Sequence, residues 1–406
     1  MLRYAEKVFH LSTRVIDRVT DHRPLPRIST SLVVKAVLAV YWSRLGSLNA
    51  LEMTRAAKLW NDWLGGPLCS ADSLGRIVAG LDAPTLRQGI HHIYDRLKRN
   101  KALPDLQGLG VAVLDGHETS ASYRRCCAGC LKRALGSGRT QFYHRNVTLM
   151  LLCGSRPSRP AVRLLLDVEP QRAGEAELAT ALRLLNRVLA AYPRAFDVVL
   201  ADALYAVAPF LNFLGWHGKE ALVVLKDERR DAYQDAAGLW DRQQPQQGCY
   251  DSRSCLWWDI PDLLSWPEVK GATRVVRSEE SWTVKPQLTK EVTSQNASWV
   301  WLTTLTVAQA RTEQIVHLGH LRWNIENHGF NELINGWHAD HVYRHQSQAI
   351  ECFLLLAFLA YNLFHAFFAL NLKPEIRRGR TMAFWVYLIA AEIHAGSRLA
   401  PRPLPP

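Results

Sequence analysis

Two short apolar runs that each end on an aspartate constrain the fold of this chain most strongly. Residues 111–115 read VAVLD and residues 198–202 read VVLAD. A short apolar run rich in valine and leucine predicts a strand that is buried on both faces. Side chains at the carboxyl ends of strands in open α/β sheets project into a shared crevice. We therefore expect Asp115 and Asp202 to lie at one edge of one sheet.

The two aspartates admit two interpretations. A carboxylate at the end of a buried strand is costly, and two together repel each other. A divalent cation relieves that repulsion, and carboxylate oxygens suit Mg²⁺ or Mn²⁺. Alternatively, each aspartate is the N-cap of a helix that follows its strand. With two such residues in one sheet, both interpretations stay open.

The segments around these aspartates alternate between strand and helix patterns. Three apolar runs come first, and helices and strands then follow in turn. The expected strands are 111–114, 146–152, 161–166, 196–201 and 220–227, and the expected helices are 174–192 and 208–218. This order predicts an α/β fold with a mixed five-stranded sheet and flanking helices.

The other segments carry their own patterns. Residues 1–105 read as an N-terminal helical domain. Within it, residues 70–100 predict two short helices, for which a DNA-reading helix-turn-helix and simple packing both stay open. Residues 228–299 have turn residues and alternating runs, which predict a β-rich, all-β insertion. Residues 373–406 are expected to form a C-terminal helix and a disordered, proline-rich tail, RLAPRPLPP.

Net charge and hydropathy limit the classes of partner that the protein can have. A net charge of +12 favours nucleic acid or an anionic membrane surface, with an ordinary basic protein as the alternative. The apolar run 352–370 is long enough to span a membrane, but it carries Asn362 and His365, so we expect a buried core helix and no membrane. The N-terminus lacks the apolar region of a signal peptide, and the scattered cysteines suit reduced thiols in a cytoplasm.

A third acidic residue would strengthen the metal interpretation. The segment 317–337, HLGHLRWNIENHGFNELINGW, reads as a helix and offers Glu326 and Glu332. Arg322 precedes Glu326 by one helical turn, on the same face. Glu332 lies well round the helix, so we select Glu326. The alternative is that Arg322 and Glu326 form an ordinary surface ion pair.

Three motifs carry a resemblance to a known family. VLDGHE, ADALY and RWNIEN resemble the acidic motifs of insertion-sequence DDE transposases, in the group with a Tyr-Arg-Glu-Lys signature. The resemblance implies a ribonuclease-H-like catalytic domain, here residues 106–227 and 300–372, interrupted by the all-β insertion. It also implies that Asp115, Asp202 and Glu326 form the catalytic, metal-binding triad.

The same resemblance implies roles for two residues near the triad and shows two departures. Arg322 matches the signature arginine, and Tyr205 matches the aromatic residue that follows the second aspartate, so both are expected to contact DNA. Gly319 stands where the signature has tyrosine, and Leu333 stands where it has lysine.

The function implied by the resemblance is DNA transposition. The protein would cut DNA at the ends of its element and join them to target DNA, using two Mg²⁺ or Mn²⁺ ions. Its partners would be double-stranded DNA and a second copy in a homodimer, and its location the cytoplasm, associated with the nucleoid. The alternatives are a catalytically inactive DNA-binding relative and a ribonuclease-H-like structure-specific nuclease.

A basic segment follows Asp115. Residues 121–160 contain eight arginines and lysines and no acidic residue. That composition predicts contacts with DNA phosphates, with a solvated basic face as the alternative. The residues proposed to contact DNA are Arg124, Arg125, Lys132, Arg133 and Arg145. In the insertion, Trp257 and Trp258 are candidates for stacking on a base.

Cysteines and histidines suggest a second kind of metal site. Cys127 and Cys130 form a Cys-x-x-Cys pair, which is half of a zinc site, and His117 or His144 could complete it. Plain reduced thiols are the alternative. We interpret His338, His341 and His345 as histidines on a helix surface or against the DNA backbone.

Overall fold

The computed structural model describes residues 1–54, 62–136, 138–157, 159–285 and 291–396. The proline-rich tail lies outside these residues. The chain forms two compact units: unit 1 contains residues 1–106, 116–192 and 326 onward, and unit 2 contains residues 107–115 and 193–325. The chain thus passes from one unit to the other directly after Asp115 and again directly before Glu326.

The N-terminal part of unit 1 is helical, as the sequence predicts. The side chain of Ser70 caps α5 by accepting a hydrogen bond from the Ser73 N–H, and Pro84 lies in the first turn of α6. At 17 residues, α6 is longer than the short helix expected there. The elements are α1 (Leu2–Phe9), η1 (Leu11–Val15), η2 (Ile16–Arg18), α2 (Thr30–Trp42), α3 (Leu48–Met53), α5 (Ala71–Val78) and α6 (Ala83–Arg99).

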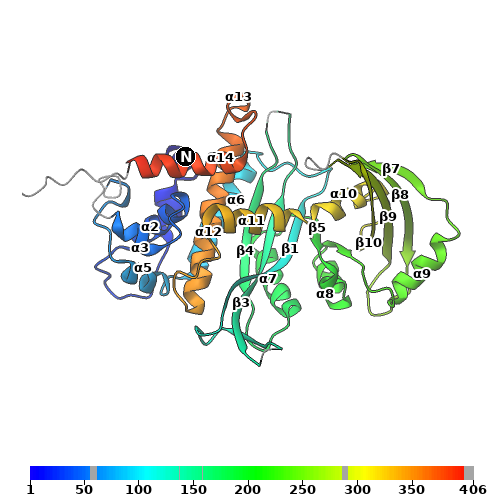
Figure 1. The fold of residues 1–406 in the computed structure, drawn as a ribbon, viewed down its shortest axis with the longest axis horizontal. Coiled ribbons are helices and arrows are strands. Elements are labelled where there is room, and N and C mark those ends of the chain that lie inside the picture. Colours follow the sequence, from blue (N-terminus) through cyan, green and yellow to red (C-terminus); the bar gives the residue numbers. More distant parts are fainter. Residues whose placement is uncertain (55–61, 137, 158, 286–290, 397–406) are drawn as a thin grey trace, which may run out of the picture. The chain divides into compact units, whose positions relative to one another are not determined.

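A long apolar helix, α12 (Ser347–Leu370), forms the core of unit 1. Among the described residues it is the one helix that is long and apolar enough to cross a membrane, and 83% of its most apolar window is buried inside the protein. It packs against α2, α6 and strand β4 (Arg163–Pro170) (Figure 1). The burial expected for residues 352–370 is therefore observed.

Asn362 connects α12 to β4. Its side-chain amide donates to the Leu165 carbonyl and its side-chain oxygen accepts from the Leu165 N–H, both at 2.9 Å. The side chain thus pairs with β4 as another strand would, and it satisfies two buried backbone groups.

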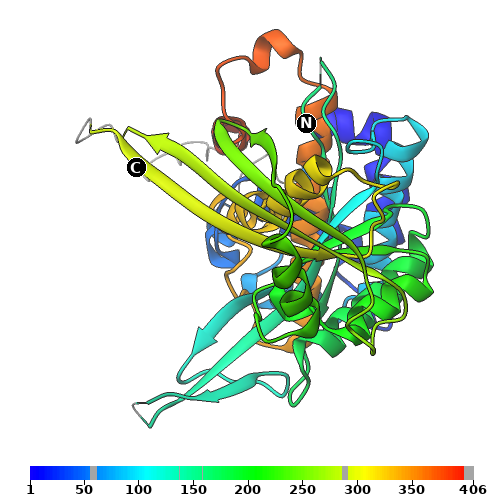
Figure 2. The same cartoon turned by 90° about the vertical axis from the view of Figure 1, so that its right-hand side faces the viewer.

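The strands of unit 1 form antiparallel pairs. β3 (Thr140–Leu152) pairs with β2 (Leu131–Ala134) and with β4, and β1 (Val111–Ser122) neighbours β3 in the sheet. The β2–β3 hairpin is visible in cyan and teal in Figure 2. The other elements of this unit are α7 (Glu177–Ala191), η4 (Ile325–Phe330), α11 (Asn331–Trp337), α13 (Pro374–Arg377) and α14 (Met382–Gly396).

Buried ion pairs hold helices of unit 1 onto β4. Arg87 of α6 donates to Asp167 at 2.8 Å and to Glu351 of α12 at 2.6 Å. Arg187 of α7 donates to the other carboxylate oxygen of Asp167 at 2.7 Å. Because these charges are paired and hydrogen-bonded, β4 can bury an acidic residue beneath three helices.

Unit 2 is built on a mixed sheet. Residues 111–113 of β1 pair in parallel with β5, and β5 pairs in parallel with β6. β10 then pairs antiparallel with β6, and β9, β8 and β7 continue the sheet. The elements are β5 (Val198–Ala201), η3 (Ala203–Tyr205), α8 (Ala208–Trp216), β6 (Glu220–Val224), α9 (Asp231–Trp240), β7 (Gln246–Tyr250), β8 (Arg253–Leu263), β9 (Thr273–Val284), β10 (Thr293–Thr303) and α10 (Thr312–Leu321).

The strands and helices expected between residues 111 and 227 are present, but the insertion differs from the expectation. Residues 228–299 are not all-β, because residues 231–240 form α9. Their long strands, drawn green to yellow in Figure 2, also extend the sheet of unit 2 through the β6–β10 pairing. Turn residues and alternating runs reveal strands, but they do not reveal which sheet the strands join.

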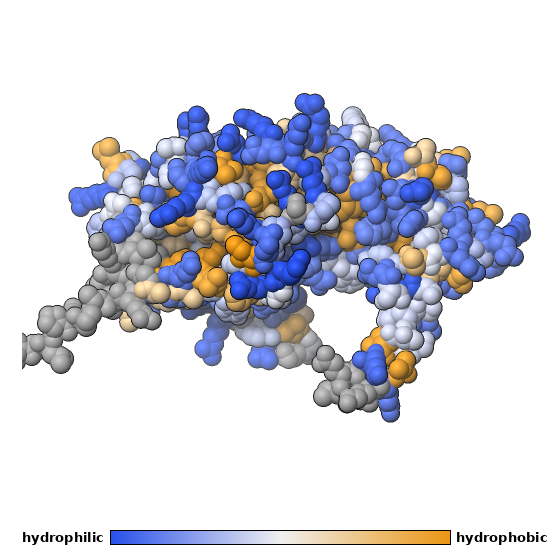
Figure 3. All heavy atoms as spheres, turned by 90° about the horizontal axis from the view of Figure 1, so that it is seen from above, coloured by the Kyte–Doolittle hydropathy of each residue, from blue (hydrophilic) through white to orange (hydrophobic). Residues whose placement is uncertain are grey.

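The surface mixes polar and apolar side chains. In Figure 3, hydrophilic residues cover most of the face shown, with smaller hydrophobic areas between them. Exposed apolar side chains include Phe384, Tyr387 and Leu388 of α14 and Trp216 of α8. Scattered apolar exposure of this kind is ordinary for folded proteins.

The pairing of Asn362 with β4 predicts a specific loss of stability. Asn362→Leu should lower the free energy of unfolding by about 2–4 kcal/mol, because two buried backbone groups of Leu165 lose their partners. Asn371→Leu, at the exposed end of the same helix, is the matched control. Urea unfolding of both variants measures the difference, and equal midpoints would contradict this role of Asn362.

Candidate functional site

Asp202 directly follows β5, as expected, but the expectation that Asp115 ends its strand is wrong. The apolar run ends at Leu114, and half-exposed residues continue β1 as far as Ser122. The parallel register pairs Val111 with Val198, Ala112 with Val199 and Val113 with Leu200. Continued by two residues, this offset places Asp115 beside Asp202. Adjacent strands are roughly 5 Å apart, and paired residues of parallel strands point to the same face. The geometry thus favours two carboxylates side by side at the level where β5 ends.

Asp202 is also a helix cap. Its Oδ1 accepts a hydrogen bond of 2.9 Å from the Leu204 N–H at the start of η3. The N-cap interpretation therefore holds for this residue, and it does not conflict with metal binding. The bond orients the carboxylate through one oxygen, and the side chain is only half-buried.

Arg322 lies beside the first aspartate. Its Nη1 is 3.5 Å from Oδ2 of Asp115, and both side chains are mostly buried. The guanidinium carbon lies 4.0 Å from the ring centre of Trp323, which is 39% exposed. One cation beside two carboxylates leaves a net negative group of hard oxygen donors. That donor set fits Mg²⁺ or Mn²⁺.

Glu326 lies in unit 1, on an irregular turn. The continuous helix expected over 317–337 is wrong: α10 ends at Leu321, and residues 325–330 form the π-helical turn η4. The one-turn spacing that placed Arg322 and Glu326 on one face therefore does not apply. Turns of this type are frequent at functional sites.

His117 is the titratable neighbour of Glu326 within unit 1. Burial lowers the pKa of His117, while the negative charges of Asp340, Glu118 and Glu326 act in the opposite direction. Its ring stacks on Phe330 with 4.4 Å between centroids.

Glu332, the glutamate not selected for the triad, binds two histidines instead. It accepts from Nε2 of His365 at 2.8 Å and from Nδ1 of His328 at 3.2 Å. Burial alone would raise the pKa of Glu332, but the interactions with His365 and His328 lower it to about 2. Glu332 therefore holds η4 and α11 against α12, which explains the buried imidazole in this apolar helix.

Three residues that were compared with the family motifs lie in the core of the described structure. Tyr205 is fully buried against Phe210, so the expectation that it contacts DNA is not met in this structure. At Gly319 an added Cβ would lie 2.3 Å from the Trp301 ring, so no tyrosine fits there. Leu333 is buried beside Phe330. Packing therefore accounts for glycine and leucine at the two positions where the resemblance expects tyrosine and lysine.

Acidic residues outside the basic segment 121–160 neutralise part of its positive charge. Arg133 pairs with Glu118 at 2.9 Å, and Arg145 pairs with Glu177 at 2.6 Å. Both acids lie outside residues 121–160, so the segment's own composition could not reveal them. The segment's other proposed DNA contacts, Arg124, Arg125 and Lys132, are exposed.

The two tryptophans proposed to stack on a base are held in the insertion. Trp257 is buried, and its ring fills the space that a side chain at Gly248 would need. Trp258 lies 4.9 Å from the guanidinium of Arg277. The expectation that Trp257 reaches DNA is therefore wrong for this structure.

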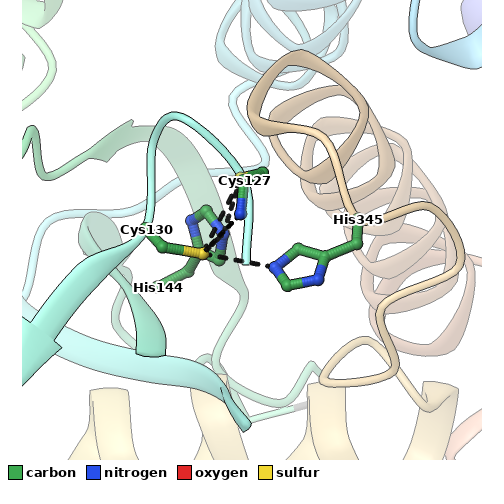
Figure 4. Close-up of side chains that lie close together, drawn as sticks. All are labelled: Cys127, Cys130, His144 and His345. Atoms are coloured by element: carbon green, nitrogen blue, oxygen red, sulfur yellow. Dashed lines mark hydrogen bonds between the residues drawn. The ribbon is translucent and has the colours of Figure 1, made fainter. Parts of the chain in front are cut away.

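A cluster of thiols and imidazoles lies within unit 1. Cys127, Cys130, His144 and His345 bring their ligand atoms within 4.8 Å of one another (Figure 4). Burial, reinforced by the neighbouring imidazole of His345, lowers the pKa of His144 to about 4. The cluster contains His144 and does not contain His117. His345, interpreted as a histidine on a helix surface or against the DNA backbone, precedes α12 and places its Nε2 3.3 Å from Sγ of Cys130.

Comparison with known protein families gives one match. Residues 159–363, half of the chain, match the model of the transposase DDE domain. The match includes Asp202 and Glu326 and begins after Asp115. No curated protein matches the chain.

The position of Glu332 predicts a pH-dependent contribution to stability. Because its pKa falls from 4.5 unfolded to about 2 folded, the contribution is complete above pH 4.5 and is lost as the pH falls toward 2. The size is about 3 kcal/mol at most. Urea unfolding should show that Glu332→Gln differs from the wild type at pH 5 and that the difference shrinks on acidification. The exposed Glu313→Gln is the control, and a pH-independent difference would refute the assignment.

Proposed function

Since the chain belongs to the transposase DDE domain family, we propose that it cuts DNA at the ends of its own element and joins them to target DNA. The observation that carries the proposal is the register of β1 and β5, which favours Asp115 beside Asp202 at the level where β5 ends. The family match contains Asp202 but begins after Asp115, so the strand register is the observation that adds Asp115 to the proposed site.

The proposed catalytic triad is Asp115, Asp202 and Glu326. The matched residues contain Asp202 and Glu326, and the strand register supports Asp115. The chain leaves unit 2 directly after Asp115 and directly before Glu326. Both residues therefore lie at points where the chain passes from one unit to the other, and we propose both as metal ligands together with Asp202.

The proposed fold of the catalytic part is ribonuclease-H-like. Its support is the antiparallel pairing of β3 with β4 and the parallel pairing of β1, β5 and β6. We retain residues 106–227 and 300–372 as the catalytic domain, 228–299 as the insertion, 1–105 as the N-terminal helical domain and 373–406 as the C-terminal segment.

The chemistry proposed is in-line phosphoryl transfer. Two bound Mg²⁺ or Mn²⁺ ions would supply Lewis-acid activation of a water or a DNA 3′-hydroxyl and would stabilise the leaving oxygen. Asp115, Asp202 and Glu326 would hold them as ionised carboxylates. Arg322 would keep the carboxylate of Asp115 oriented and would add positive charge near the scissile phosphate.

The proposed DNA-binding side chains lie on the segment that follows β1. Arg124, Arg125 and Lys132 are exposed for phosphate contacts, and Arg133 and Arg145 can exchange their carboxylate partners for phosphates. The partners are the double-stranded element ends and the target, bound by a homodimer beside the nucleoid in the cytoplasm.

The triad predicts metal-dependent cleavage of end-bearing DNA. On a duplex carrying the inverted repeat that flanks the coding region, the wild type should release the 3′ end only with Mg²⁺ or Mn²⁺. Asp115→Asn, Asp202→Asn and Glu326→Gln should each slow cleavage by about 100-fold or more, because each removes a metal ligand.

Two exposed acids provide matched controls for this experiment. Asp235→Asn on α9 and Glu313→Gln on α10 make the same chemical change away from the site and should cleave like the wild type. Full activity in any of the three triad variants would refute the triad. Cleavage without joining to a second DNA would instead indicate a nuclease.

The exposed arginines predict the salt dependence of DNA binding. Replacing Arg124 and Arg125 with glutamine should weaken binding to any duplex and reduce the slope of log K against log salt by about 2. Arg229→Gln with Arg242→Gln, both exposed in unit 2, is the matched control. A titration with fluorescent duplex at several salt concentrations measures the slopes, and an unchanged slope for the first pair would remove these residues from the interface.

A further inference from the structure

Four side chains from three separate segments of unit 1 converge on one point. Cys127 and Cys130 come from the loop between β1 and β2, His144 comes from β3, and His345 precedes α12. Figure 4 shows both imidazole rings facing the sulfur atoms. The triad proposed above uses none of these residues, so the cluster requires its own explanation.

Four of the separations between these ligand atoms match a tetrahedral metal site, and the others are at most 4.8 Å. Zinc bonds of about 2.3 Å to sulfur and 2.0 Å to nitrogen imply separations of about 3.8 Å between sulfurs and about 3.5 Å between sulfur and nitrogen. The two Sγ atoms are 3.8 Å apart. Nε2 of His144 lies 3.3 Å from each sulfur, and Nε2 of His345 lies 3.3 Å from Sγ of Cys130.

Thiol protons and a disulfide both explain the cluster less well. Nε2 of His144 carries either one proton or one lone pair, so it can make one ordinary hydrogen bond, yet it lies 3.3 Å from both sulfurs. A disulfide needs the sulfurs at about 2.05 Å. One cation at the centre would satisfy all of the contacts together.

The surrounding backbone already supports a metal-binding turn. The Cys127 N–H donates to Sγ of Cys130 at 3.2 Å, and the Cys130 N–H donates to the Cys127 carbonyl at 3.1 Å. Ser347 Oγ lies 3.6 Å from Sγ of Cys127, in space that a side chain at Gly129 would occupy. Such outer hydrogen bonds orient ligands and stabilise a thiolate.

We propose that Cys127, Cys130, His144 and His345 bind one zinc ion in a structural site. Two sulfurs and two imidazoles are the ligands that zinc prefers, and the cluster contains none of the carboxylates that Mg²⁺ needs. Four protein ligands fill the tetrahedral shell, so no position is open for a substrate. Binding releases the two thiol protons to solvent.

The ion would tie the loop after β1 to the segment that precedes α12. His345 is 215 residues from Cys130, so the ion would close a long loop of chain, which includes residues 193–325 of unit 2. Arg124 and Arg125 lie on the same loop, directly before the cysteines. The zinc site would therefore fix the backbone that carries two proposed phosphate contacts.

Metal analysis of the full-length wild type tests the proposal without any substitution. After purification with zinc, elemental analysis should find one zinc per chain. Replacement by Co²⁺ should give the visible absorption bands of tetrahedral cobalt with thiolate ligands. Chelation should lower the midpoint of thermal unfolding by about 5 °C or more. A wild type that binds neither metal would overturn the site.

Substitutions identify the zinc ligands, and substitutions of a nearby cysteine and a nearby histidine serve as controls. Cys130→Ser and His345→Ala should each lose the zinc and the cobalt spectrum. Cys126→Ser, next to Cys127, and His341→Ala, near His345, should keep both. Retention of zinc by both ligand variants would refute the assignment, and the wild-type cobalt spectrum decides if those variants do not fold. The zinc site does not depend on catalysis. A protein without zinc could still cleave DNA in a metal-dependent way, so the two proposals can fail separately.

Discussion

The parallel pairing of β1 with β5 is the interaction on which the proposed site depends. Backbone hydrogen bonds fix the register of residues 111–113 against 198–200, and continuing it by two residues favours Asp115 beside Asp202. Residues 111–114 and 198–201 are buried, so this part of the sheet lies in the apolar core. The same burial that stabilises the strands favours two neighbouring carboxylates there, and bound cations would relieve their repulsion.

The sequence was sufficient to predict the two strands that position these aspartates. Val198, Val199 and Leu200 are apolar because β5 is buried on both faces, and that run can be recognised without a structure. Asp202 could be selected because it directly follows a strand, whereas Asp115 was selected from the end of an apolar run and in fact lies inside β1. The helix α12 could also be predicted, because its long apolar run is visible in the sequence. Its two polar residues, Asn362 and His365, are buried with hydrogen-bond partners.

Features that depend on distant partners could not be read from the chain. His345 is a metal-ligand candidate only because folding brings it to Cys130, and no local pattern distinguishes it from His341. The turn that carries Glu326 departs from the helical period, so spacing gave the wrong face. Tyr205 follows a strand-end aspartate and still packs inward. The acids that neutralise Arg133 and Arg145 lie outside the basic segment.

Anomalous diffraction from crystals grown with Mn²⁺ tests the central claim most directly, because it locates the ion without relying on activity. The account predicts a manganese peak about 2 Å from carboxylate oxygens of both Asp115 and Asp202. A fully occupied manganese site elsewhere, with no peak between these two side chains, would contradict it.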